Sequence, residues 1–121
     1  KVNEDVADFV IPLCATIHLS GSTLKIVACA IALMLMHGTP VEASNMIYFI
    51  CMLGVVMVAA PGVPGGAIMA AVSVLQSILG FDANQIALMI ALYITMDNFG
   101  TACNVTGDGA IALIIDKLYK K

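Results

Sequence analysis

The chain has 121 residues, of which 61% are hydrophobic and 11% are charged, and its formal net charge is −3. Its mean hydropathy of +1.03 lies far outside the range of soluble globular domains, so the composition predicts a membrane protein. A weakly acidic chain with no basic stripe and no aromatic stacking platform excludes a nucleic-acid-binding protein.

The first apolar segment, residues 8–37, is longer than the roughly 20 residues that span a bilayer. Its middle, Thr16 to Thr23, is rich in hydroxyl groups and also contains His18 and Gly21. We therefore predict a broken transmembrane helix with halves at 8–17 and 22–37. The unwound link between them would leave backbone carbonyls free to bind a ligand or an ion. The second half is expected to end at Gly38, a glycine cap that precedes a proline.

The second segment, residues 44–80, carries no charge but is interrupted by Pro61-Gly62-Val63-Pro64-Gly65-Gly66. The prolines and glycines cannot continue a helix. Of the two arms, 44–60 is of marginal length for an independent transmembrane span and 67–79 is too short for one. This pattern predicts a re-entrant helical hairpin. Its tip leaves backbone groups unpaired, so the tip should line a polar cavity.

The third segment, residues 84–117, is predicted to form one final transmembrane helix. Within it, Asp97, Thr101, Asn104 and Asp108 fall within a sector of roughly 60° at 100° per residue. Two carboxylates and an amide on one stripe are unlike a lipid-facing surface, so the stripe should line a cavity for a cation or a zwitterion. The alternative is polar packing between helices.

The lysine-rich end of the chain, at Lys117, Lys120 and Lys121, favours a cytoplasmic C-terminus. With two full spans and a hairpin that returns to its own side, the N-terminus is then expected in the cytoplasm as well. The hairpin would enter the membrane from outside.

Three features together resemble one family: the broken helix, the Gly-Val-Pro-Gly tip at 62–65, and Asp-x-x-x-Thr-x-x-Asn-Val-Thr-Gly-Asp at 97–108. This family is that of the dicarboxylate/amino acid:cation symporters, the sodium-coupled glutamate and neutral amino acid transporters. The resemblance covers the whole chain as seventh helix, second hairpin and eighth helix. Residues 1–121 are thus expected to be the C-terminal part of the transport domain of a longer chain.

The resemblance implies an all-α membrane protein with an elevator-type transport domain, working in a homotrimer as a multi-pass protein of the plasma or inner membrane. Its partners would be an amino acid, sodium, the lipid bilayer and the rest of the transporter chain, with no cofactor besides the coupling ions. Asp97 would bind the amino group of the substrate, Thr101 would support it, and Asn104 would bind the α-carboxylate. The substrate site would comprise Asp97, Gly100, Thr101, Asn104, Ser22, Gly62 and Val63.

Sodium would bind at two places by the same resemblance. Asp108 would supply the carboxylate of one site, together with backbone carbonyls of Cys14, His18 and Asn104. Thr16 and the hairpin carbonyls of Met57, Val58 and Ala60 would form the other. Oxygen ligands of this kind suit a hard cation.

Two departures from the family pattern bear on the substrate and the ions. Gly100 stands where members with acidic substrates carry an arginine, so we expect a neutral amino acid, since glycine cannot grip a carboxylate. The alternative is an acidic amino acid or dicarboxylate, with the arginine in the absent first hairpin. The second departure is His18-Leu19-Ser20-Gly21-Ser22, where the family usually has Asn-Met-Asp-Gly-Thr. Ser20 replaces an aspartate that, by the resemblance, serves a further sodium site deep in the transport domain, so its loss should weaken or abolish that site.

Lys25 is an unusual cation within an apolar segment. We hypothesise that Lys25 or protonated His18 supplies positive charge in place of sodium, so that transport uses fewer sodium ions or a proton. The simpler alternatives are a packed, satisfied His18 and a Lys25 that snorkels to water or pairs with an aspartate such as Asp97.

Other functions find little support in the sequence. The residues show no catalytic spacing, which argues against an enzyme. A small packing or pore-forming module that does not transport remains the rival class. The cysteines lack CxxC spacing and indicate packing residues rather than a metal site or a disulfide: Cys14, Cys29, Cys51 and Cys103.

Overall fold

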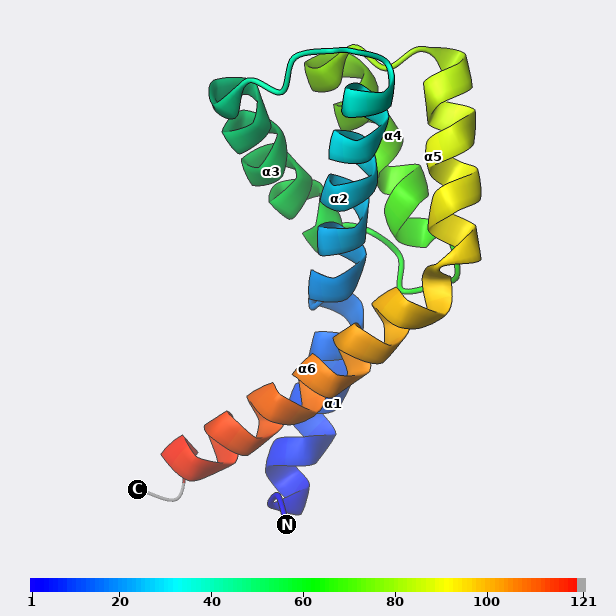
Figure 1. Ribbon diagram of the computed structural model, residues 1–121. Helices are drawn as coiled ribbons and strands as arrows, with labels where there is room; N and C mark the ends of the chain where they lie inside the picture. Colours follow the sequence, from blue (N-terminus) through cyan, green and yellow to red (C-terminus); the bar gives the residue numbers. More distant parts are fainter. Residues whose placement is uncertain (120–121) are drawn as a thin grey trace.

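The computed structural model describes residues 1–119 and builds them from helices alone (Figure 1). The predicted all-α class is therefore confirmed for this part of the chain. In chain order the helices are α1 (Glu4–Ile17), α2 (Ser20–Met36), α3 (Ala43–Val58), α4 (Gly66–Leu79), α5 (Ala83–Thr95) and α6 (Asp97–Tyr119).

The first predicted helix is broken, but the break is shorter than expected. Only His18 and Leu19 leave the helical conformation, whereas Ser20 and Gly21 already belong to α2. Helix α1 also begins earlier than predicted, because the side chain of Asn3 accepts a hydrogen bond from the Asp5 amide and caps the helix. Together, α1 and α2 are long and apolar enough to cross a membrane.

Helices α3 and α4 form a hairpin whose turn lies at the middle of the molecule (Figure 1). The two arms have 16 and 14 residues, fewer than a full span requires. Gly65, with φ at 76°, precedes α4, and Gly80, with φ at 69°, ends it. Both residues adopt the left-handed conformation that glycine accommodates without strain.

The prediction of one continuous helix over 84–117 is wrong. The helix breaks at Met96, and α5 and α6 meet at a bend of 61°. The break frees carbonyl groups at the end of α5, and the Lys25 ammonium donates to those of Tyr93, at 3.1 Å, and Met96, at 3.4 Å. An inserted side chain of this kind is a known cause of helix kinks. The bent pair can form a second span.

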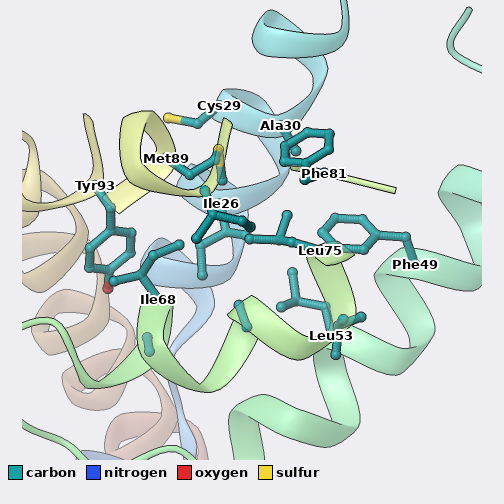
Figure 2. Packing of buried hydrophobic residues seen from close by; sticks show 14 of the residues in the cluster. Ile26, Cys29, Ala30, Phe49, Leu53, Ile68, Leu75, Phe81, Met89 and Tyr93 are labelled. Atoms are coloured by element: carbon teal, nitrogen blue, oxygen red, sulfur yellow. The ribbon is translucent and has the colours of Figure 1, made fainter. Parts of the chain in front are cut away.

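Two hydrophobic clusters lie on either side of these breaks. Side chains from α2, α3, α4 and α5 form the larger cluster, shown in Figure 2, in which Ile26, Phe49, Leu75 and Met89 are fully buried. The smaller cluster joins α1 to α6 through Val6, Val10, Cys14 and Ala112. Hence α5 belongs to one cluster and α6 to the other.

The outer surface is strongly apolar. Among the described residues, eight large hydrophobic side chains are 65–76% exposed: Phe9, Leu24, Leu35, Met36, Val55, Phe99, Leu118 and Tyr119. In water, such a surface would aggregate, whereas hydrocarbon or a neighbouring membrane helix accommodates it. The surface therefore agrees with the membrane environment predicted from composition.

Candidate functional site

A cavity of about 220 Å³ lies where the two helix breaks meet the turn of the hairpin. Its walls come from the end of α1, the His18–Leu19 break, the start of α2, the 61–64 turn, the end of α5 and the first half of α6. Backbone groups that leave regular helices at membrane depth require a polar environment, and this cavity provides one.

The polar stripe of α6 faces this cavity. Asp97, Thr101, Asn104 and Asp108 all line it, which is the arrangement that their helical spacing predicts. Six of the seven predicted substrate-binding residues lie on its wall: Asp97, Thr101, Asn104, Ser22, Gly62 and Val63. Their roles toward a ligand stay predictions.

Asn104 joins α6 to the start of α2. Its side-chain oxygen accepts a hydrogen bond of 2.8 Å from the Gly21 amide, and its amide nitrogen donates to the Ser22 hydroxyl at 3.1 Å. The N-cap residue of α2, Leu19, makes no capping bond with its side chain, so Asn104 supplies the missing acceptor from another helix. One amide hydrogen of Asn104 remains available to a ligand.

His18 pairs with Asp108 on the cavity wall. The distance from His18 Nδ1 to Asp108 Oδ1 is 2.7 Å, and because a carboxylate only accepts, Nδ1 is the donor. Gly107 lies directly under the imidazole, and a Cβ atom at this position would collide with the ring carbon Cε1. Glycine thus permits the close approach that the pair requires.

Lys25 pairs with Asp97, as the alternative interpretation of this lysine predicts. Its ammonium lies 3.1 Å from Asp97 Oδ1, and its side chain is 8% exposed, so it does not snorkel to water. The same ammonium covers Gly100, where an added Cβ atom would come within 3.2 Å of Nζ. Gly100 is buried and does not line the cavity. Lys25 therefore occupies the space beside Gly100, and this position offers no room to a ligand side chain.

Several predicted sodium ligands lie away from the cavity. Thr16 is exposed and donates its hydroxyl hydrogen to the Leu13 carbonyl, and Val58 is also exposed. The carbonyl of Cys14 accepts the His18 amide at 2.8 Å. Met57 and Ala60 are buried in the larger cluster. Of the predicted ligands, His18, Asn104 and Asp108 line the cavity, and the Cys14 carbonyl is bonded to the His18 amide beside them. Their roles toward sodium stay predictions.

Residues 1–119 contain no group of three or more His, Cys, Asp or Glu side chains suited to a metal ion. A cation at Asp108 would thus depend on carbonyl, amide and carboxylate oxygens. Such ligands suit sodium better than a transition metal.

Seven residues of the cavity wall were not among the predicted site residues: Ala15, Leu19, Pro61, Pro64, Ala67, Tyr93 and Val105. The prolines belong to the predicted hairpin tip, so only their individual roles went unnoticed. Tyr93 precedes Asp97 by four residues, which would place it on the polar stripe if the helix were continuous. That spacing was a usable signal.

An apolar helical chain with two interrupted helices, a hairpin and a polar cavity at the interruptions has the architecture of a membrane transport protein. The sequence model of the sodium:dicarboxylate symporter family matches residues 1–118, and the chain belongs to this family. The family resemblance and the prediction that the chain is not an enzyme are both confirmed.

Curated relatives include excitatory amino acid transporter 3 of Mus musculus, 29% identical over 121 residues, which are 100% of this chain and 23% of the relative. Excitatory amino acid transporter 5 of Homo sapiens is 28% identical over 120 residues, which are 99% of this chain and 21% of the relative. Excitatory amino acid transporter 1 of Ambystoma tigrinum is 29% identical over 120 residues, which are 99% of this chain and 22% of the relative. The chain thus spans less than a quarter of their length. No solved structure matches it.

Proposed function

We propose that this chain forms the ligand-binding part of a sodium-coupled symporter for an acidic organic ligand, either an acidic amino acid or a dicarboxylate. Membership in the sodium:dicarboxylate symporter family supports coupling to sodium. The relatives named above are transporters of excitatory, that is acidic, amino acids, which favours the acidic alternative over the neutral ligand expected from Gly100. Gly100 does not line the cavity and the Lys25 ammonium lies against it, so this position does not favour a neutral ligand over an acidic one.

The observation that carries this proposal is the convergence of the α6 stripe and the hairpin turn on one cavity. Thr101 and the free amide hydrogen of Asn104 are donors that suit a ligand carboxylate. Asp108 attracts a cation. In this proposal, an arginine that binds the ligand carboxylate would come from a part of the transporter other than residues 1–121. Ligand and sodium would then occupy one connected site.

Coupling follows from the cost of charge within a membrane. A cavity with an uncompensated carboxylate closes and crosses the bilayer at a high free-energy cost, so sodium near Asp108 favours the closed, mobile state. The exposed turn at Gly62 and Val63 lines the cavity, and it would act as the gate. In this proposal the domain moves like an elevator against a trimeric scaffold, with both ends of the chain in the cytoplasm.

The test is sodium-driven uptake of radiolabelled L-aspartate and succinate by proteoliposomes that contain the natural gene product with this sequence. We expect accumulation only with an inward sodium gradient. Asp108→Asn should raise the sodium concentration for half-maximal uptake by about tenfold, because it removes a charged ligand of the ion.

Asp82→Asn is the matched control for this measurement. It removes the same charge from a position outside the cavity, and asparagine retains the capping function of Asp82 at the start of α5. Uptake without a sodium gradient, or an equal response of the two variants to sodium, would contradict the proposal. The absence of any transport would favour the packing or pore module.

A further inference from the structure

The ammonium of Lys25 has a complete set of partners inside the protein. It donates to the carbonyls of Tyr93 and Met96 and to Asp97 Oδ1, at 3.1, 3.4 and 3.1 Å. The ring of Tyr93 covers it at 3.4 Å from Nζ to the centroid. An ammonium has three N–H donors, so Lys25 has none left for a ligand.

Lys25 therefore acts on the cavity through Asp97. Asp97 lines the cavity and its side chain is 26% exposed, whereas Lys25 lies behind it and does not line the cavity. Asp97 is therefore the residue that contacts a ligand. Lys25 is a positioning residue that neutralises the Asp97 carboxylate.

Both carboxylates on the cavity wall are already paired with cationic or proton-donating side chains of the chain itself. Asp97 holds Lys25, and Asp108 holds His18. A ligand ammonium on Asp97 would lie beside the Lys25 ammonium on the same carboxylate. Two like charges in a partly buried site repel each other strongly, since the surrounding protein screens them less than water does.

We propose that Lys25 is a built-in ammonium that occupies Asp97, so that the cavity selects an acidic ligand without an amino group over the amino acid with the same carboxylates. The favoured class is an aliphatic dicarboxylate. This inference rests on the proposed function and names the ligand class of the same site. In this proposal, Lys25 alone distinguishes a dicarboxylate from the amino acid that carries the same two carboxylates.

The test compares succinate with L-aspartate, which differ only by the amino group. Dissociation constants are measured by isothermal titration calorimetry with sodium on the purified natural gene product. The wild-type protein should bind succinate about tenfold more tightly or better, the scale that like-charge repulsion sets. Lys25→Met keeps the aliphatic stem and frees Asp97, so the ratio of the two constants should shift by about tenfold or more toward aspartate.

Two further variants keep the result interpretable. Lys117→Met removes an exposed lysine of α6 and should leave the ratio unchanged. The double variant Lys25→Met/Asp97→Asn removes both charges of the pair, so it leaves no unpaired carboxylate at position 97 that could destabilise the fold. It should bind succinate and L-aspartate with similar dissociation constants.

The outcomes separate this inference from the proposed function. A wild-type protein that prefers aspartate, or a Lys25→Met protein with the wild-type ratio, overturns the role of Lys25 while sodium-coupled uptake of acidic ligands stands. Binding of neither ligand overturns both proposals.

Discussion

Replacing Asn104 by alanine tests the contact that fixes α6 against the start of α2. The variant removes the acceptor of the Gly21 amide and the donor to the Ser22 hydroxyl. The amide of Gly21 lies in the first turn of α2, where no side chain of the N-cap residue replaces the lost acceptor. Asn104→Ala should therefore uncouple two helices and leave the end of one uncapped.

The magnitude follows from these two contacts. A side-chain hydrogen bond between membrane helices contributes about 0.6 kcal/mol on average. The loss of a helix N-cap costs about 1 kcal/mol. The bond to Gly21 carries the capping effect and the bond to Ser22 adds the interhelical term, so we expect Asn104→Ala to lower the free energy of unfolding by about 1.5 to 2 kcal/mol.

The assay is reversible unfolding of the natural gene product in mixed micelles, followed by circular dichroism. Asn98→Ala is the matched control, because it makes the same substitution at an exposed position of the same helix. An Asn104→Ala protein that unfolds no more easily than Asn98→Ala would refute the capping role of Asn104. The comparison does not depend on the identity of the ligand.

Two further substitutions test local geometry. Gly107→Ala places a Cβ atom against the His18 ring and should break its bond to Asp108, so sodium-dependent uptake should fall several-fold, whereas Gly109→Ala, with open space around it, should transport normally. Asp82→Ala removes the capping box of α5 and should cost about 1 kcal/mol in the same unfolding assay, with little loss for Asp82→Asn. Normal uptake by Gly107→Ala, or equal stability of the two Asp82 variants, would contradict these assignments.

Much of the cavity was predictable from spacing along the chain. The positions of Asp97, Thr101, Asn104 and Asp108 define one face of a helix whatever the helix packs against, and that face lines the cavity. The turn between α3 and α4 was equally accessible, because proline and glycine interrupt a helix through their own backbone geometry. Both predictions depend only on local chemistry.

The bend at Met96 was not predictable in this way. The sequence from Leu92 to Phe99 contains neither proline nor glycine, so no local signal marks the break. The carbonyls freed at the break are bonded by Lys25, about 70 residues earlier in the chain, so the bend depends on a tertiary contact. The same contact explains why Gly100 could not be interpreted correctly from its neighbours alone.

The two hydrophobic clusters have a mechanical consequence. The breaks at His18–Leu19 and Met96 lie at the boundary between the clusters, and the cavity lies there too. A change in the angle between α5 and α6 would change the distance between Tyr93 and Asp108, because Tyr93 packs in the larger cluster whereas Asp108 lies on α6, which joins the smaller one. A ligand bound between these two residues would oppose the change in angle. Occupancy of the cavity and the angle between α5 and α6 are therefore coupled.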